Sequence, residues 1–302
     1  MRILVEPRRR GVPLDLGRPC LPGSKSHTQR AMLLAAFLPG DRVLAGALRS
    51  RDTEVLAAAL RRCGARCRWT RHGLQVRGRA RRALLDVDLH VEENGTALRT
   101  LLLLVPLLGG RLRIDGSAGL RRRPIAPALQ ALARAGVGVA GRRLPVVVDG
   151  RRTTVAAITV AADITSQAAT GALLAAALRP VGERTRNAVL VRIVRPAAPD
   201  YLQLTIALLR QFGFVVRART VGRDLHCRVG PGRAPPRRIH IPPDPSARTF
   251  ALALAALHGR DARELLPRVP GDPHPEWQSD DDCARLRAAG TARLLLRDLH
   301  AR

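Results

Sequence analysis

Lysine is almost absent from this chain, and aromatic side chains are scarce. Among 52 Lys and Arg residues only Lys25 is a lysine, and Phe, Trp and Tyr together make up 2% of the 302 residues. So few aromatics disfavour proteins that read nucleic acids by stacking bases on aromatic rings. Acidic residues number only 24, which gives a formal net charge of +28. A wholly disordered chain is excluded because 46% of the residues are hydrophobic.

The excess of arginine is spread along the whole chain, with short clusters at residues 8–10, 79–82 and 121–123. A genome that encodes arginine in place of lysine accounts for most of it. A dedicated nucleic-acid protein would gather its basic residues on one face or arm. We therefore expect non-specific attraction to polyanions but no specific nucleic-acid partner. Lys25 stands out because an ammonium group is compact and can give up a proton, whereas a guanidinium cannot.

Cysteines and long apolar runs are also few. The five cysteines are an odd number without zinc-ligand spacing, which favours a reducing compartment. Cys63 and Cys67 stand four residues apart, a spacing that predicts packing on one face of a helix. The N-terminus lacks the apolar run of a signal peptide, and the longest such run, residues 101–108, contains Pro106 and is too short to span a membrane. We expect a cytoplasmic protein with no membrane partner.

Four segments repeat one pattern, in which small polar residues precede a helix of alanine and leucine. A second amphipathic helix follows in each unit, with Asp, Pro or Ser at its start, and the first three of these end at Gly64, Gly136 and Gly213, as helix C-termini often do. Short β-branched runs lie between and after the helices. Each unit reads helix, strand, helix and one or two strands, so the chain is α/β with about four units. The first helices begin at Ser24, Asn94, Thr165 and Asp244, and the second near Asp52, Pro124, Asp200 and Ser279.

The polar helix starts have a chemical consequence. Ser, Asn, Thr and Asp are preferred N-caps, and the free N–H groups of the first turn attract anions. Several buried helices that begin at one surface would form an anion site. Ordinary capping is the alternative explanation for any single start. The first three starts carry further polar groups that capping does not need, namely Lys25, Arg30, Arg99 and Gln167.

Residues 21–36, which read Leu-Pro-Gly-Ser-Lys-Ser-His-Thr-Gln-Arg-Ala-Met-Leu-Leu-Ala-Ala, closely resemble the signature of the 3-phosphoshikimate 1-carboxyvinyltransferase (EPSP synthase) family. They are not a Walker A loop, because Ser24 separates Gly23 from Lys25. Weaker matches follow in the family's order and extend the resemblance over roughly residues 18–290. They comprise Asn94-Gly-Thr-Ala-Leu-Arg99, residues 116–125 ending in Arg-Pro-Ile, Thr165-Ser-Gln167, residues 201–213, Asp244-Pro-Ser246 and residues 277–280.

The resemblance implies an inside-out repeat fold of six helix-strand-helix-strand units, three per domain, around a cleft. Residues 17–239 would form one complete three-unit domain, and residues 1–16 and 240–302 part of a second. The implied reaction transfers the enolpyruvyl group of phosphoenolpyruvate to the 5-hydroxyl of shikimate 3-phosphate, in aromatic amino acid biosynthesis. It needs no metal or cofactor, and both small-molecule partners are anions.

The resemblance also assigns roles by position. Lys25 would touch both substrates and manage proton transfer, and burial near arginine would lower its pKa. Ser26 and Arg30 would bind the shikimate moiety. Arg123 and the amide of Gly95 would hold phosphoenolpyruvate.

At the third helix start, the resemblance implies that Thr165 and Ser166 bind the 3-phosphate and that Gln167 binds the ring hydroxyls. Glu92 and Glu93 depart from the family pattern, and carboxylates beside an anion site are unfavourable unless they pair with arginine. The chain also shows four units where six are expected. The absent part carries the family's catalytic Asp, its Lys-Glu pair and further arginines.

Three functional hypotheses remain open. The first is a carboxyvinyltransferase, active alone or completed by self-association or another chain. The second is a non-catalytic relative that binds shikimate 3-phosphate or another small anion. The third is a polyanion-binding protein that exploits the net charge of +28.

Overall fold

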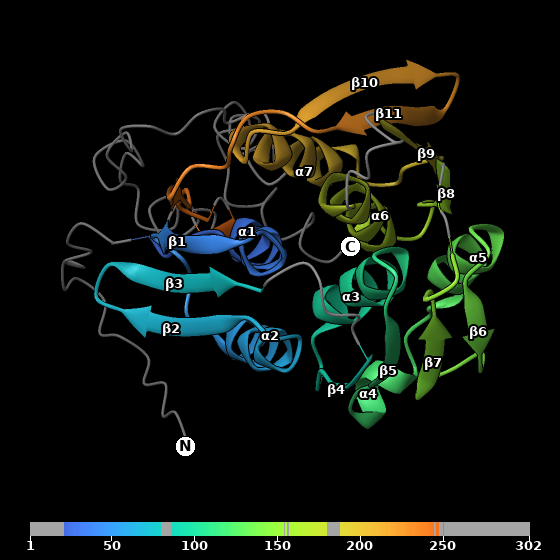
Figure 1. Ribbon diagram of the computed structural model, residues 1–302, viewed down its shortest axis with the longest axis horizontal. Helices are drawn as coiled ribbons and strands as arrows, with labels where there is room; N and C mark the ends of the chain where they lie inside the picture. The colour runs from blue at the N-terminus through green and yellow to red at the C-terminus, as the bar shows by residue number, and fades with distance from the viewer. Residues whose placement is uncertain are drawn as a thin grey trace, which may run out of the picture.

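The computed structural model of the protein describes residues 21–79, 86–153, 155, 157–179, 188–244, 246–247 and 250 (Figure 1). Within these residues the strands form three four-stranded sheets. Each sheet belongs to one unit of about the same design, in which a parallel strand pair is extended by an antiparallel hairpin. The units follow one another along the chain, and helices connect the strands of each.

The second unit shows the design most plainly. Its strands lie in the order β4-β5-β7-β6, with β4 and β5 parallel and the other neighbours antiparallel. The first helix of the unit connects the parallel pair, as a crossover must. Its elements are β4 (Asp86–His90), α3 (Gly95–Leu107), β5 (Arg111–Asp115), α4 (Ala118–Arg121), α5 (Ala126–Arg134), β6 (Gly138–Ala140) and β7 (Val146–Asp149).

The third unit repeats this arrangement with strand order β10-β11-β9-β8. Here β8 and β9 are parallel, and the hairpin of β10 and β11 extends the sheet. Its elements are β8 (Ala157–Ala161), α6 (Gln167–Leu178), β9 (Val189–Val194), α7 (Pro199–Gln211), β10 (Val215–Val221) and β11 (Asp224–Gly230).

The first unit takes its leading strand from the segment that follows the third unit in the chain. Its order is β12-β1-β3-β2, and β12 pairs in parallel with β1, so it stands where β4 and β8 stand in the other units. The chain therefore returns to the first sheet after completing the third. The elements are α1 (Lys25–Phe37), β1 (Gly40–Ala45), α2 (Arg51–Arg62), β2 (Arg66–Thr70), β3 (Gly73–Gly78) and β12 (Arg238–His240).

Helices α1, α3 and α6 lie in the middle of the three sheets (Figure 1). Nearly all their residues after the first turn are buried, which explains why they are apolar on every side. Helices α3 and α6 pack closely at Gly171, where an added Cβ would come within 3.0 Å of the Thr100 Cα. The prediction that the first helix of each unit is buried is confirmed for these three.

Several predictions about elements are confirmed and others are wrong. The second helices do end at Gly64, Gly136 and Gly213, which all have positive φ. The predicted order of helix, strand, helix and strands is also observed in each unit, and each sheet contains one further parallel strand, namely β12, β4 or β8. The prediction that Cys63 and Cys67 share a helix face is wrong, because Cys63 caps α2 and Cys67 lies in β2. Both thiols are nonetheless buried, as the packing interpretation requires.

The predicted fourth unit falls almost entirely outside the described residues, as do residues 1–16. Of its first helix, only residues 246, 247 and 250 are described, and they are helical. Among the described helices, none is both long enough and apolar enough to cross a membrane.

Candidate functional site

The N-terminal ends of α1, α2, α3 and α6 meet at one place, and side-chain contacts connect each to the next. Lys25 at the start of α1 pairs with Asp52 of α2. The side chain of Asn94, which caps α3, donates to the Asp52 carbonyl at 2.8 Å. Arg99 of α3 donates in turn to Gln167, the first residue of α6. Because each helix start presents free N–H groups and the positive end of its dipole, this meeting point favours anions.

Lys25 lies at the open side of this meeting point. Its Nζ is 3.0 Å from Asp52 Oδ2, and the two side chains are 51% and 33% exposed. The backbone N–H of Lys25 donates to Asp244 Oδ2 at 3.0 Å, which ties the helix start to the segment after β12. The burial among arginines expected for Lys25 is therefore wrong in this structure. Its ammonium group is neutralised by a carboxylate and remains accessible to a ligand.

Gly95 sits at the centre of a cationic cluster. A Cβ on Gly95 would lie 2.8 Å from Arg99 Nη1 and 3.2 Å from Arg123 Nη1. Burial, followed by the nearby Arg123, lowers the pKa of Arg99. Neither guanidinium pairs with a carboxylate among the described residues. Two such groups beside one backbone amide form a place for an anion that only glycine leaves open.

Gln167 joins the cluster to α6. Its Oε1 accepts from Arg99 Nη1 at 2.9 Å, and its Nε2 donates to Thr96 Oγ1 at 3.1 Å. The Arg99 side chain is held further by the carbonyl of Pro124 at 3.1 Å. These contacts fix the amide of Gln167 in one orientation at the mouth of the site.

The two hydroxyl groups at the start of α6, those of Thr165 and Ser166, differ in their contacts. Thr165 Oγ1 accepts from the Gln167 N–H at 3.3 Å. Ser166 is the N-cap residue, yet its side chain makes no capping hydrogen bond and is 6% exposed. The hydroxyl of Thr165 is therefore used to cap the helix, whereas the hydroxyl of Ser166 is available to another partner.

Arg30 is buried behind the helix starts. Its Nε donates to Thr205 Oγ1 at 2.9 Å, and its Nη1 to the carbonyl of Ser26 at 2.9 Å. Its Nη2 lies 3.3 Å from Thr170 Oγ1, and the Tyr201 ring centroid is 5.9 Å from its Cζ. Burial lowers the pKa of Arg30 to about 10. A guanidinium has five N–H groups, so two remain for a ligand after these three bonds.

Among the described residues, one of the two glutamates before Asn94 is paired with an arginine. Glu92 accepts two hydrogen bonds from Arg51, at 2.7 and 2.6 Å, and Glu93 contacts the hydroxyl of Ser117. The arginine partner expected for these two carboxylates is therefore found for Glu92, whereas the described contact of Glu93 is with a hydroxyl. No described group of three or more His, Cys, Asp or Glu residues is arranged to hold a metal ion.

Sequence reasoning missed Asp52, Thr205 and Tyr201 as neighbours of the predicted residues. The position of Asp52 indicated only the start of a helix. Thr205 and Tyr201 belong to an amphipathic helix, and nothing in the sequence near them indicates that this helix contacts α1. Of the predicted residues, the contacts above bring Gly95, Arg123 and Gln167 together with Thr165 and Ser166, and they link Lys25 to this group through Asp52 and Asn94. Ser26 and Arg30 are joined to each other on α1.

The protein is of the α/β class, with a three-sheet repeat in which the polar N-termini of central helices meet. The sequence profile of EPSP synthase (3-phosphoshikimate 1-carboxyvinyltransferase) matches residues 17–263, so the chain belongs to the EPSP synthase family. It is 33% identical over 263 residues to the 3-phosphoshikimate 1-carboxyvinyltransferase of Bordetella parapertussis, covering 83% of this chain and 58% of that protein. To the one of Mycobacterium ulcerans it is 37% identical over 248 residues, covering 79% and 55%.

Solved structures agree on the fold. EPSP synthase from Acinetobacter baumannii matches with a TM-score of 0.63 at 23% identity, covering 80% of this chain and 53% of that one. The enolpyruvyl transferase NikO from Streptomyces tendae matches with a TM-score of 0.52 at 17% identity, covering 77% and 53%. The chain spans just over half the length of the relatives it matches.

Proposed function

We propose that this chain supplies the shikimate 3-phosphate subsite and part of the phosphoenolpyruvate subsite of an EPSP synthase site. In the proposed reaction, the enolpyruvyl group of phosphoenolpyruvate passes to the 5-hydroxyl of shikimate 3-phosphate. The observation that carries the proposal is the cluster around Gly95, where Arg99, Arg123 and Gln167 meet the start of α3. That cluster leaves two cationic groups beside an open backbone amide, in a chain that belongs to this family.

Shikimate 3-phosphate would bind across the starts of α6 and α1. The hydroxyl of Ser166, which capping does not use, would donate to the 3-phosphate together with Thr165. Gln167, oriented by Arg99, would contact ring hydroxyls. Ser26 and the two remaining N–H groups of Arg30 would hold the rest of the shikimate moiety.

Phosphoenolpyruvate would occupy the cluster itself. Its phosphate or carboxylate would accept from the Gly95 amide and from Arg123, in line with the preference of planar guanidinium groups for such anions. Arg99 would act through its charge and through the position of Gln167. This arrangement uses every cation of the cluster without a metal.

Lys25 would lie between the two substrates. When they enter, their anionic groups compete with Asp52 for the ammonium group, which is already half exposed. The reaction protonates C3 of phosphoenolpyruvate, forms a bond between C2 and the 5-oxygen as its proton leaves, and then expels phosphate with loss of a C3 proton. Lys25 can serve one of these proton transfers. The other proton transfers would then fall to groups beyond the described residues.

A second candidate function is binding without turnover. The chain spans 55–58% of its relatives' length, while all the residues proposed to hold shikimate 3-phosphate are described. Binding of shikimate 3-phosphate can therefore be complete in a chain that needs a second polypeptide, or a second copy, for catalysis.

The test is calorimetric titration of the purified protein with shikimate 3-phosphate at low and high salt. Lys25→Ala is compared with Arg77→Ala, because Arg77 is also an exposed cation paired with an aspartate, Asp41, at 2.7 Å. We expect saturable binding that survives high salt, is lost in Lys25→Ala and is retained in Arg77→Ala. Equal loss in both variants, or binding that disappears with salt, would contradict the proposal.

A turnover assay with phosphoenolpyruvate separates the two candidate functions. Release of phosphate that depends on both substrates supports the transferase. Binding of shikimate 3-phosphate without phosphate release supports the non-catalytic function of the chain by itself.

A further inference from the structure

The outer face of the β10-β11-β9-β8 sheet carries four arginines in neighbouring positions. Arg217 of β10 stands opposite Arg228 of β11, and Arg219 stands opposite His226, which stands opposite Arg192 of β9. Cross-strand partners, and residues two apart along a strand, share one face of a sheet. All four arginines are exposed. We call Arg192, Arg217, Arg219 and Arg228 the arginine ladder.

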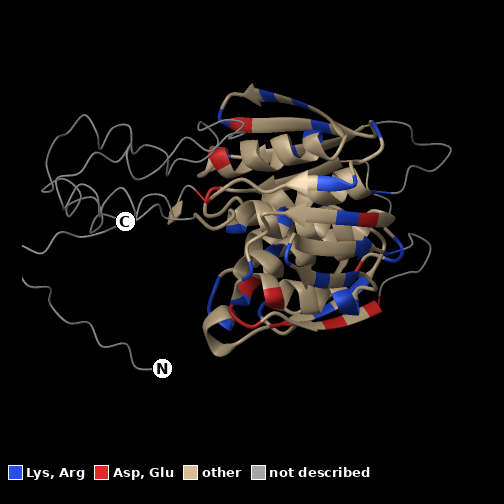
Figure 2. Ribbon diagram, turned by 90° about the vertical axis from the view of Figure 1, so that its left-hand side faces the viewer, with Lys and Arg blue, Asp and Glu red and all other residues tan. Residues whose placement is uncertain are grey.

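The hydrophobic pattern of the strands fixes the ladder in place. The alternate residues Val191, Val216, Cys227 and Val229 are at most 5% exposed and face the core. A shift of one residue in β9 or β11 would bury arginine and expose valine, so the register of these two strands is strongly specified. Blue Lys and Arg bands recur along the two uppermost strands of Figure 2, where β10 and β11 lie.

Among the described residues, no carboxylate forms an ion pair with the arginine ladder. None of its four side chains has a hydrogen-bond or ion-pair partner in the part of the chain that the structure describes. Asp224, at the turn end of β11, pairs in register with Val221, and its side chain accepts from the backbone N–H of Arg195. Like charges that face each other across strands destabilise a sheet. Repulsion between these arginines therefore lowers the stability of the free protein, and a bound anion would reduce that repulsion.

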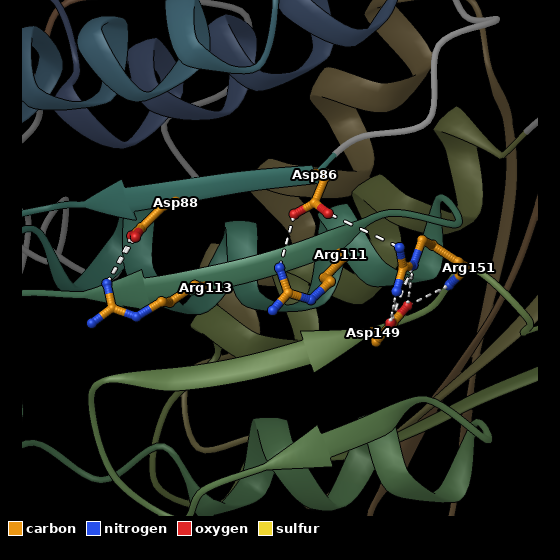
Figure 3. A network of polar contacts seen from close by, with 6 residues as sticks. All are labelled: Asp86, Asp88, Arg111, Arg113, Asp149 and Arg151. Carbon is orange, nitrogen blue, oxygen red and sulfur yellow. Dashed lines mark hydrogen bonds and ion pairs between the residues drawn. The ribbon is translucent and has the colours of Figure 1, made fainter.

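The β4-β5-β7-β6 sheet is also rich in arginine, but its arginines are paired with aspartates. On the outer face of β4, β5 and β7, arginines alternate with aspartates in register (Figure 3). Arg111 lies 3.0 Å from Asp86, and Arg113 lies 2.9 Å from Asp88. An arginine-rich genome therefore does not by itself leave the arginines of a sheet unpaired in this protein.

We propose that the arginine ladder binds the phosphate backbone of a single-stranded nucleic acid, at a site separate from the substrate site. Strands lie about 4.8 Å apart and successive outward residues about 7 Å apart, so the ladder offers a grid of cations to a chain of phosphates. Among the described residues of this face, His226 is the one aromatic side chain, which predicts contacts mainly to phosphates rather than to stacked bases. Recognition would therefore be independent of sequence.

The first measurement is fluorescence anisotropy of a labelled 30-nucleotide oligo(dT) strand titrated with the intact protein. With four phosphate contacts on a single strand, the logarithm of affinity should fall with the logarithm of salt with a slope of about −2.8. That slope corresponds to about a 50-fold loss of affinity between 50 and 200 mM salt. No binding of the strand at 50 mM salt would overturn the proposal.

The decisive comparison uses two variants with the same net charge. One replaces the arginine ladder with glutamine, and the other replaces Arg77, Arg111, Arg113 and Arg151, which pair with aspartates on the other two sheets. We expect the ladder variant to lose at least tenfold in affinity and most of its salt dependence, and the control to stay within about twofold of the natural protein. An equal loss in both would show that net charge alone attracts the strand.

Folding and specificity are checked in the same proteins. Because the substitutions relieve like-charge repulsion, the ladder variant should unfold at the same or a higher temperature than the natural protein, and the oligonucleotide should raise the unfolding temperature of the natural protein only. Shikimate 3-phosphate should not displace the strand. Ladder-dependent binding of anionic vesicles or an acidic peptide, with none of oligo(dT), would contradict the nucleic-acid assignment.

Discussion

Gln167 accepts a hydrogen bond from Arg99 at 2.9 Å across 68 residues of sequence. The contact joins the second turn of α3 to the first residue of α6, and these two helices pack closely in the core. It holds a neutral amide and a guanidinium side by side at the rim of the site. Both therefore reach a ligand in fixed positions, and little side-chain entropy is lost when it binds.

Replacing Gly95 by alanine should weaken binding of shikimate 3-phosphate about tenfold. The new Cβ would lie 2.8 Å from Arg99 Nη1, so the guanidinium must move and its bond to Gln167 weakens. Loss of one hydrogen bond to a charged group, worth about 1.5 kcal/mol, corresponds to that factor. Calorimetric titration measures it. Gly138→Ala is the control, because its Cβ would meet nothing closer than 3.5 Å, and an equal loss there would disprove the steric argument.

Replacing Thr205 by valine should destabilise the fold by about 1–3 kcal/mol, because a buried guanidinium loses an acceptor. Thr205 is fully buried, and its Oγ1 accepts from Arg30 Nε at 2.9 Å. Urea unfolding followed by circular dichroism gives the difference. The matched control is Thr159→Val on β8, whose side chain is on the outer face of its sheet. A Thr205→Val protein as stable as the control would show that Arg30 does not depend on this contact.

The stability of the protein should fall as pH decreases from about 6.5 to about 4, in part because of His27. Burial, followed by Arg30, lowers the pKa of His27 in the folded protein from 6.5 to about 4. The unfolded chain binds the proton first in this window, so His27 contributes stability above pH 6.5 that is lost by about pH 4. The loss amounts to about 3 kcal/mol.

Urea unfolding at a series of pH values tests this contribution. His27→Gln should flatten the decline between pH 6.5 and 4, whereas His72→Gln, at an exposed turn position, should leave it unchanged. The idea fails when the two variants show the same pH dependence as the natural protein.

Three buried thiols should react slowly in the folded protein. Burial raises the pKa of Cys63 to about 12, and those of Cys67 and Cys227 to about 11. Because the thiolate is the reactive form, a disulfide reagent at pH 8 should label them at least a hundredfold faster in urea than in buffer. Cys20 and Cys283 are first replaced by serine, since they lie outside the described residues. Rapid labelling without urea would contradict the burial of these thiols.

The sequence was sufficient to predict the buried helices and their polar starts. Residues 24–40, 94–109 and 165–178 are apolar on every side after a polar first turn, and helices α1, α3 and α6 occupy them. The glycines that follow the second helices correctly predicted where those helices end. Several strands were not predicted because they contain no hydrophobic run. In Asp86–His90, for example, polar residues alternate with single apolar ones.

Much of the candidate site could be predicted in the same way, but its internal contacts could not. Lys25, Gly95, Arg123 and Gln167 were identified from a family motif and from helix starts. Nothing local indicates that Asp52 neutralises Lys25, because the two residues belong to different helices. The roles of the site residues stay predictions until ligand binding is measured.

The amino-acid sequence by itself determined the units, their central helices and the family, because helix periodicity, capping and motif order act over short distances. Only the tertiary structure decided which residues meet. It brought β12 to β1, enclosed Arg30 with Thr205, and left Arg192, Arg217, Arg219 and Arg228 on one face with no ion-pair partner among the described residues. The physical reason is that strand pairing and helix packing join segments far apart in sequence, and the charge partners of a residue depend on that pairing.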